Sequence, residues 1–105
     1  MKKAEQIEVN NFAESVCVNV SEYVNSYRAG CIGQLRSCAA TVYYYNRYFI
    51  LKSYNTIVAA ITPDDECVDF LRYVYGYTAT SAQHIAKFFA DYAPKDAPRY
   101  TWREV

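Results

Sequence analysis

The chain is predicted to be a single α+β domain, in which one or two helices pack on one face of a small antiparallel sheet of three to five strands. Two observations predict this fold. In the middle of the chain, short segments rich in β-branched and aromatic residues alternate with tight turns. After them comes a segment whose apolar residues recur at helical spacing. Because the chain has 105 residues, residues 1–105 are expected to share one core.

The first helix is predicted over residues 11–27. Asn10 or Asn11 would cap its start, and Gly30 would end it. The alternation of valines at positions 16, 18 and 20 leaves a strand as the alternative, because β-branched residues favour strands. Residues 28–37 are predicted to be a flexible connector. The apolar face of the helix would consist of Phe12, Val16, Val20, Tyr23, Val24 and Tyr27.

Successive short strands are predicted in the middle of the chain. Asn46 and Arg47 suit a tight turn, and Pro63 suits the second position of a turn over residues 62–65. The interruption at residues 53–55 is either a short turn or a bulge. Tight connections of this kind predict antiparallel pairing. The predicted strands cover residues 41–45, 48–51, 56–61 and 67–75.

The second helix is predicted to begin at Thr80, because Thr80 and Gln83 match a capping box. Pro94 would end it. Residues 94–98 would then form a stiff linker, and residues 100–103 a final strand. The apolar face of this helix is expected to cover one side of the sheet and contains Ile85, Phe88, Phe89 and Tyr92.

The sequence contains no nucleophile elbow, zinc-protease motif or dinucleotide-binding motif, so the chain is predicted not to be an enzyme. The single histidine, His84, would need Cys38 or Cys67 as a partner to form a nucleophilic site, and a structural histidine is favoured. The carboxylates at positions 64, 65, 66 and 69 match no calcium-binding loop and are interpreted as a solvated turn. Neither a metal site nor a cofactor is expected.

Cysteine usage and hydropathy predict a cytoplasmic protein with no membrane partner. No apolar run follows the first two lysines, and no stretch approaches the ~18 apolar residues of a membrane span. In the cytoplasm the thiols are expected to stay reduced. A zinc site with three cysteines and the histidine is the alternative, but the local ligand pairs of such sites are missing. Buried structural thiols are therefore predicted at Cys17, Cys31, Cys38 and Cys67.

The predicted function is the binding of another macromolecule. Eleven basic residues balance eleven acidic ones, which argues against a highly acidic nucleic-acid mimic and against a histone-like binder. Tyrosine and arginine are enriched at protein interfaces, and aromatic residues beside basic ones also suit base stacking on single-stranded nucleic acid. The alternative is that the tyrosines only stabilise the sheet. The predicted contact residues are Tyr43, Tyr44, Tyr45, Arg47, Tyr48, Lys52, Tyr54, Arg72, Tyr73 and Tyr75, with Tyr77 following them.

Two segments resemble a known group of proteins. Residues 52–59 read Lys-Ser-Tyr-Asn-Thr-Ile-Val-Ala, and residues 78–89 read Thr-Ala-Thr-Ser-Ala-Gln-His-Ile-Ala-Lys-Phe-Phe. They resemble the Ser-Tyr-x-Thr-x-Val-Ala strand and the Thr-Thr-x-x-His-Ile-x-x-Phe helix of small proteins carried by bacteriophages and mobile elements. The match covers about residues 43–92. In length and style the chain also resembles small anti-CRISPR proteins.

This resemblance implies a phage or mobile-element protein that acts in the bacterial cytosol of its host. There it would bind and block a type II CRISPR-Cas RNA-guided nuclease, which would be its protein partner. The alternative is an accessory protein of a mobile element that binds single-stranded nucleic acid. A homo-oligomer joined through the edges of the sheet is a third hypothesis.

Overall fold

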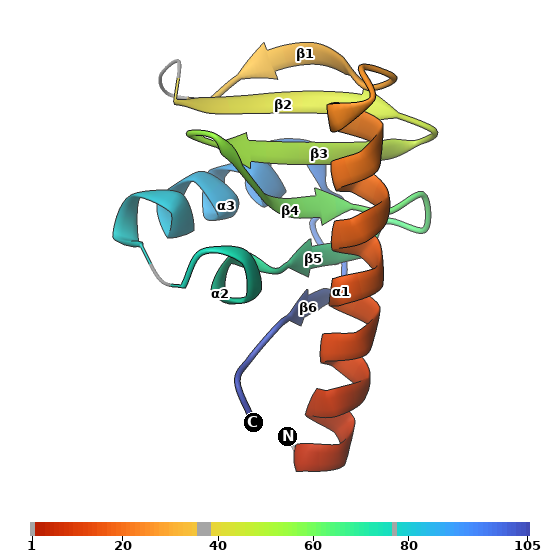
Figure 1. Ribbon diagram of the computed structural model, residues 1–105, viewed down its shortest axis with the longest axis vertical. Coiled ribbons are helices and arrows are strands. Elements are labelled where there is room, and N and C mark those ends of the chain that lie inside the picture. The colour runs from red at the N-terminus through yellow and green to blue at the C-terminus, as the bar shows by residue number, and fades with distance from the viewer. Residues whose placement is uncertain (1, 36–38, 77) are drawn as a thin grey trace.

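A computed structural model describes residues 2–35, 39–76 and 78–105. These residues form one six-stranded sheet and three helices, and the strands lie side by side in chain order (Figure 1). Neighbouring strands are antiparallel except for the last two, which are parallel. The strands are β1 (Gly30–Gln34), β2 (Ala40–Tyr45), β3 (Tyr48–Ser53), β4 (Thr56–Ile61), β5 (Cys67–Asp69) and β6 (Arg99–Thr101). The helices are α1 (Lys3–Asn25), α2 (Leu71–Val74) and α3 (Ala79–Tyr92).

The α+β class is confirmed, but the described residues form six strands where three to five were predicted, and three helices where one or two were predicted. Strand β1 lies inside the predicted connector, where two glycines indicated flexibility. At Gly33 the missing side chain serves packing, because a Cβ there would lie 3.1 Å from the hydroxyl oxygen of Tyr92. The final strand was predicted and is found as β6.

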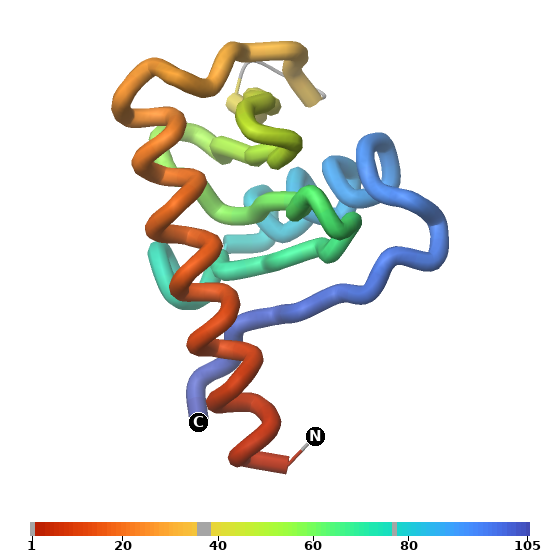
Figure 2. Tube along the Cα trace, turned by 90° about the vertical axis from the view of Figure 1, so that its right-hand side faces the viewer, coloured from red at the N-terminus to blue at the C-terminus, as the bar shows by residue number. Residues whose placement is uncertain are grey.

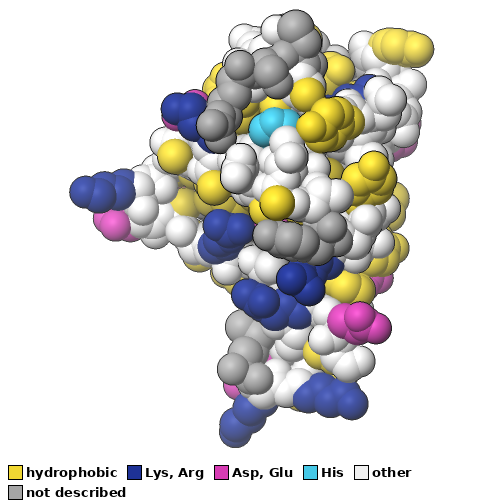
Figure 3. All heavy atoms as spheres, turned by 90° about the vertical axis from the view of Figure 1, so that its left-hand side faces the viewer, with side chains coloured by type: hydrophobic (Ala, Val, Ile, Leu, Met, Phe, Trp, Pro, Cys, Tyr) yellow, Lys and Arg dark blue, Asp and Glu magenta, His cyan; other side chains and the backbone are white. Residues whose placement is uncertain are grey.

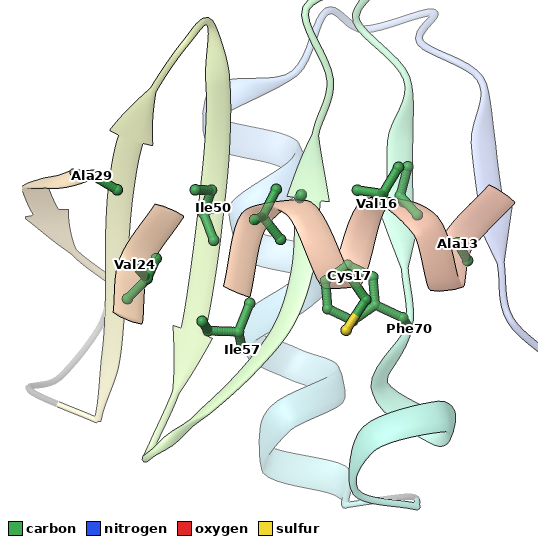
Figure 4. Packing of buried hydrophobic residues seen from close by; sticks show 11 residues of the cluster. Ala13, Val16, Cys17, Val24, Ala29, Ile50, Ile57 and Phe70 are labelled. Atoms are coloured by element: carbon green, nitrogen blue, oxygen red, sulfur yellow. The ribbon is translucent and has the colours of Figure 1, made fainter. Parts of the chain in front are cut away.

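Helices cover both faces of the sheet, which corrects the prediction that they pack on one face only. Helix α1 crosses one face and α3 lies against the other (Figures 1 and 2). Two cores result, and neighbouring residues of β3 belong to different ones: Ile50 faces α1, whereas Leu51 faces α3. Figure 4 shows the α1 core, which contains Ala13, Val16, Cys17, Val20, Val24, Ala29, Ile50, Ile57, Ala60, Val68 and Phe70.

The first helix is confirmed, and the strand alternative is wrong. Val16 and Val20 are buried whereas Val18 is 65% exposed, as a helical and not an alternating pattern requires. The helix begins at Lys3 instead of residue 11, because its buried face continues towards the N-terminus through polar side chains. Despite its length, α1 lacks the apolar stretch that a membrane-crossing helix needs, and so do the other helices in the described residues.

Two polar side chains on the buried face of α1 hold the C-terminal segment. The Gln6 amide donates to the Thr101 carbonyl at 3.0 Å. The Asn10 side chain donates to the Arg103 carbonyl at 2.6 Å and accepts from the Arg103 N–H at 3.0 Å. In addition, the Trp102 indole donates to Glu14 at 2.9 Å. The polar residues at the start of α1 are therefore buried because they bind the backbone of a distant segment.

The end of α1 differs from the prediction, which placed the stop at Gly30. The helix ends at Asn25, and Tyr27 adopts a left-handed backbone conformation with φ of 63°. The N–H groups of Arg28 and Ala29 both donate to the Tyr23 carbonyl, at 3.0 Å each. A tyrosine thus occupies the position at which helices usually carry glycine.

The predicted turns are confirmed. Asn46 and Arg47 have φ of 51° and 64°, the pattern of a type I′ hairpin turn. The interruption after β3 is a turn and not a bulge, with Tyr54 at φ of 56°. A bulge does occur nearby, but it lies inside β4, where the pairing of β3 with β4 skips Val58. In the next turn the Asp65 N–H donates to the Thr62 carbonyl at 2.9 Å.

The strand predicted over residues 67–75 is wrong beyond Asp69. A carboxylate oxygen of Asp69 accepts a hydrogen bond from the N–H of Leu71 at 3.1 Å, and the chain turns there into the short helix α2. An aspartate that binds the backbone two residues ahead favours a turn over a strand.

The last helix is confirmed, but its cap is Thr78 and not Thr80. The Thr78 hydroxyl accepts from the Ser81 N–H at 3.2 Å, and Thr78 has the extended backbone of an N-cap. Ile85 and Phe88 are buried as predicted, and Phe89 and Tyr92 are half-buried. The α3 core contains Leu35, Ala40, Val42, Leu51, Val58, Ala59, Ile61, Cys67, Leu71, Ile85 and Phe88.

Candidate functional site

The ten residues predicted to contact a partner do not share one open face, because helices cover both faces of the sheet. Tyr44 lies on the α3 side, and Arg47 is exposed in the β2–β3 turn. Four residues are half-buried on the α1 side: Tyr43, Tyr45, Tyr48 and Lys52. The other four lie at the end of the sheet where β3 turns into β4 and where α2 follows β5: Tyr54, Arg72, Tyr73 and Tyr75.

The tyrosines on the α1 side pack against the helix. The Tyr23 ring of α1 lies 4.9 Å from the ring of Tyr45 and 5.8 Å from that of Tyr48. Burial raises the pKa of the Tyr48 phenol, and Tyr23, Glu66 and Asp64 raise it further. These rings fasten the C-terminal half of α1 to the sheet, so much of their surface already has a partner.

On the α3 side, aromatic rings form a row that reaches the surface at Tyr44. The ring of Tyr44 lies 5.0 Å from that of Phe49, which lies 5.3 Å from that of Tyr92. Tyr44 is 40% exposed, whereas Phe49 is half-buried. Tyr44 therefore covers the edge of the α3 core and offers only part of its ring to solvent.

The most exposed tyrosines of the predicted set lie together at one end of the molecule. Tyr54, Tyr73 and Tyr75 are 54%, 44% and 56% exposed, and Arg72 is exposed beside them in sequence. The β3–β4 turn carries Tyr54, whereas α2 and the residue after it carry the other three. The turn and α2 lie at the same end of the sheet (Figure 1). Figure 3 views the molecule from this end. We call the set of Tyr54, Arg72, Tyr73 and Tyr75 the tyrosine end.

Tyr54 and Tyr73 of this set are held by neighbouring residues. The Tyr54 ring lies 5.9 Å from the His84 ring, and the Tyr54 N–H donates to the Ala39 carbonyl. The ring of Tyr73 lies 5.5 Å from that of Trp102. The rings are therefore positioned while about half of their surface stays accessible, as an interface anchor requires.

A buried cluster of three polar side chains lies beneath Tyr54. The Ser53 hydroxyl is 2.9 Å from the Ser81 hydroxyl and 2.8 Å from Nδ1 of His84. A serine beside a histidine is the arrangement of a nucleophile and its base. Here Ser53 is only 2% exposed, which leaves no room for a substrate at its oxygen. The hydrogen bonds of Ser53 with Ser81 and His84 instead connect β3 to α3.

The cysteine–histidine pair considered from the sequence does not form with Cys67. Cys67 pairs with Ile61 at one end of β4, whereas Ser53, which binds His84, pairs with Thr56 at the other end. At ~3.3 Å per residue the two groups are about 16 Å apart along the strand. Cys38, the other thiol considered, lies outside the described residues, as does Tyr77.

The other thiols differ in exposure. Cys17 and Cys67 are buried as predicted, whereas Cys31 is exposed on β1, which corrects the prediction for that residue. Burial raises the pKa of the Cys17 thiol. Burial also raises the pKa of Cys67, and the Arg99 guanidinium partly offsets this. A buried thiol with a raised pKa is a packing residue and a poor nucleophile.

The carboxylates near the β4–β5 turn do not converge on one point. Asp69 accepts from Arg99 at 3.0 Å as well as from the backbone, and Glu66 accepts from the Thr62 hydroxyl at 2.9 Å. Asp64 and Asp65 are exposed. Within residues 2–35, 39–76 and 78–105, no group of three or more ligand-type side chains is arranged to hold a metal ion.

The structure also brings together residues that the sequence analysis missed. Glu5, Glu8 and Phe12 lie on one side of α1, and they line a groove with Glu66 and Tyr100. Residues three and four apart lie on the same side of a helix, so the spacing of Glu5, Glu8 and Phe12 could have predicted that they line one surface. This pattern was not recognised because the helix was predicted to begin at residue 11.

Comparison with known proteins places the chain in a family without assigning it an activity. No curated protein and no solved structure matches it. One family model matches residues 3–104, which is nearly the whole chain and includes both α1 and β6. The chain therefore belongs to DUF8033, a family of unknown function.

Proposed function

We propose that this chain is a non-catalytic binding protein that blocks a type II CRISPR-Cas RNA-guided nuclease of its bacterial host. The observation that carries the proposal is that three exposed aromatic side chains, Tyr54, Tyr73 and Tyr75, lie on segments at the same end of the sheet. Large aromatic side chains are typical anchors of protein interfaces. A bacterial cytosolic location follows from such a target.

The backbone of Tyr54 supports the same interpretation. With φ of 56°, Tyr54 occupies a left-handed conformation that costs a bulky residue about 1 kcal/mol relative to glycine. Glycine would stabilise the turn but would remove the side chain. A strained and exposed residue is typical of functional sites.

The choice of target rests on the resemblance of two segments to phage and mobile-element proteins. Residues 52–59 contain Tyr54, and residues 78–89 begin shortly after α2. Both segments therefore border the tyrosine end. A protein encoded by a mobile element shares a cell with the RNA-guided nuclease that cleaves such elements, so the two proteins meet in the same compartment.

The test combines binding and cleavage assays with purified type II nucleases. We expect the chain to co-elute with one of them and to stop target cleavage when the two are present in equal amounts. Tyr54→Gly should raise the melting temperature and weaken the complex about fivefold or more, because it relieves the backbone and removes one contact.

Asp65→Gly is the matched control. Asp65 is exposed and has φ of 62°, but it lies in the β4–β5 turn, at the opposite end of β4 from Tyr54. Its replacement also places glycine at a left-handed turn position, and it should change the stability little and leave the complex as strong. Unchanged cleavage and no complex across a panel of type II nucleases would exclude this target. Equal weakening by both variants would exclude a specific contact at Tyr54.

A second candidate function is the binding of single-stranded nucleic acid. The charged side chains visible around the tyrosine end are mainly Lys and Arg (Figure 3). Tyrosine rings beside cations suit base stacking along a phosphate backbone. This function requires affinity for a fluorescent oligonucleotide that falls steeply with salt and falls further in Tyr54→Ala and Tyr75→Ala. Binding that is absent or insensitive to salt would exclude it.

A further inference from the structure

A groove of about 410 Å³ lies between the N-terminal half of α1, β6 and the β4–β5 turn. Figure 2 views this side and shows the chain that leads into β6 running from α3 towards the lower half of α1. The groove has an apolar lining of Val9, Phe12 and Tyr100. The rings of Phe12 and Tyr100 meet edge to face, with centroids 5.4 Å apart. An aromatic surface is thus held open to solvent by packing between two elements.

Three carboxylates line the same groove: Glu5, Glu8 and Glu66. Glu5 and Glu8 are exposed, and Glu66 is half-buried with a hydroxyl donor from Thr62. No Lys or Arg side chain lines the groove, and none of the ion pairs among the described residues involves these carboxylates. The groove therefore combines an aromatic lining with negative charge that has no cationic partner in the described part of the chain.

We propose that this groove binds an arginine side chain from a basic segment of a partner protein. A guanidinium group stacks on an aromatic face and donates hydrogen bonds to carboxylates in its own plane. Phe12 and Tyr100 supply the aromatic surface, and Glu5, Glu8 and Glu66 supply the acceptors. Charge-assisted hydrogen bonds of this kind are stronger than neutral ones.

The charge of the groove selects the class of partner. Three carboxylates repel the phosphates of nucleic acids and of anionic lipids. A wholly apolar segment would desolvate these carboxylates without pairing them, which is unfavourable. A basic protein segment meets both requirements. The inference is independent of the proposed function, because the groove shares no residue with the tyrosine end.

The test is a titration of the full ¹⁵N-labelled chain with the peptide acetyl-Gly-Arg-Gly-Arg-Gly-amide, followed by NMR. We expect saturable shifts of the Val9, Phe12 and Tyr100 amides, which weaken as salt is raised from about 0.05 to about 0.5 M. The same peptide with citrulline in place of arginine keeps the shape without the charge. It should give no saturable shift, and a lysine peptide should bind more weakly.

Paired variants locate the effect. Glu5→Gln/Glu8→Gln should weaken arginine-peptide binding about five- to tenfold. Asp91→Asn/Asp96→Asn removes the same charge from exposed positions in and after α3 and should change the affinity less than about twofold. Far-UV circular dichroism checks that both double variants fold. The proposal is overturned if the arginine peptide does not saturate, if citrulline or lysine binds equally well, or if the control pair weakens binding as much.

Discussion

At the scale of single residues, bulky side chains occupy backbone positions that glycine usually fills. Among the described non-glycine residues, positive φ occurs at Tyr27, Asn46, Arg47, Tyr54 and Asp65. Asn and Asp reach this conformation readily, because their short side chains form local hydrogen bonds. Tyrosine and arginine lack that compensation. Each of the three bulky residues therefore destabilises the fold by about 1 kcal/mol relative to glycine.

Tyr27→Gly is expected to stabilise the protein. Tyr27 is 93% exposed, so its replacement loses little packing and relieves a backbone with φ of 63°. The free energy of unfolding should rise by about 1 kcal/mol, and the melting temperature by about 4–8 °C. Tyr27→Ala is the control, because it removes the ring but keeps the Cβ. An equal gain in both variants would show that the backbone is not the cause.

Ionisable side chains that are buried or half-buried make the stability of the protein depend on pH in the alkaline range. Burial raises the pKa of Cys17 and Cys67 above the ordinary value of 9.0. Burial also raises the pKa of Tyr48 above 10.0. The unfolded chain therefore loses these protons at a lower pH than the folded chain. Their contribution to stability is complete below about pH 9 and is lost as pH rises through the folded-state values.

The expected outcome is a urea unfolding midpoint that falls as the pH rises from about 9 to about 10.5. Cys17→Ala should lower stability at neutral pH, because it removes a buried sulfur, but should make the alkaline decline shallower. Cys31→Ala, at an exposed thiol, is the control for loss of a cysteine. An alkaline decline in Cys17→Ala as steep as in the natural sequence would contradict the assignment to that thiol.

At the scale of elements, α1 is an amphipathic helix whose buried face changes character along its length. Its C-terminal half buries Val16, Val20 and Val24, whereas its N-terminal half buries Gln6 and Asn10. The valines pack on the sheet, and the amides hydrogen-bond to the backbone at the end of β6 and just after it. The helix thus joins the two ends of the chain through polar contacts and covers the centre of the sheet through apolar ones.

Asn10→Ala is expected to lower the free energy of unfolding by about 2 kcal/mol, because it leaves the N–H and carbonyl of Arg103 without their partner. Urea unfolding measures this change. Asn11→Ala, at the next and exposed position, should stay within about 0.5 kcal/mol of the natural sequence. An equal loss of stability in both variants would indicate an effect of helix propensity and not of the hydrogen bonds between Asn10 and the Arg103 backbone.

At the scale of the whole molecule, one sheet carries two cores. Ile50 and Leu51 are adjacent in β3 but contribute to opposite cores. The two cores therefore share the same strands. If these strands separate, the apolar side chains of both cores become exposed to water. This arrangement predicts a single cooperative unfolding transition.

Ile85→Val tests the coupling of the cores. The substitution trims the α3 core and should cost about 0.5–1.5 kcal/mol. The only tryptophan, Trp102, packs against the α1 core on the other face. Its fluorescence should report the same lowered midpoint as far-UV circular dichroism. A tryptophan transition that stays unchanged while the dichroism shifts would show that the two faces unfold separately.

The groove and the tyrosine end also belong to this scale, because each combines segments that are distant in the chain. In the groove, Glu66 and Tyr100 lie beside residues of α1. At the tyrosine end, the β3–β4 turn lies at the same end of the sheet as α2. All four residues of the tyrosine end were among the predicted contact residues, but the sequence did not show which face or end of the sheet they occupy. The groove was missed completely, because the helix was predicted to begin at residue 11 and because Glu66 and Tyr100 are distant from α1 in the sequence.

Local patterns in the sequence were enough to predict the α+β class, the central strands, the Asn46–Arg47 turn and the apolar face of α3. Each of these depends on residues that are neighbours along the chain, so their periodicity and turn chemistry carry the information. The same patterns identified where tyrosines are dense. They were insufficient to assign each tyrosine to a face, because alternation defines two sides without saying what covers either.

Only the tertiary structure decided that α1 starts at Lys3, that β1 joins the sheet, and that α1 and α3 lie on opposite faces. The physical reason is that these features depend on partners far away in the chain. Gln6 and Asn10 are buried because the backbone at Thr101 and Arg103 satisfies their hydrogen bonds. From its neighbours in the sequence alone, a polar residue is predicted to be exposed. Its burial becomes favourable only when the distant hydrogen-bond partner is in place.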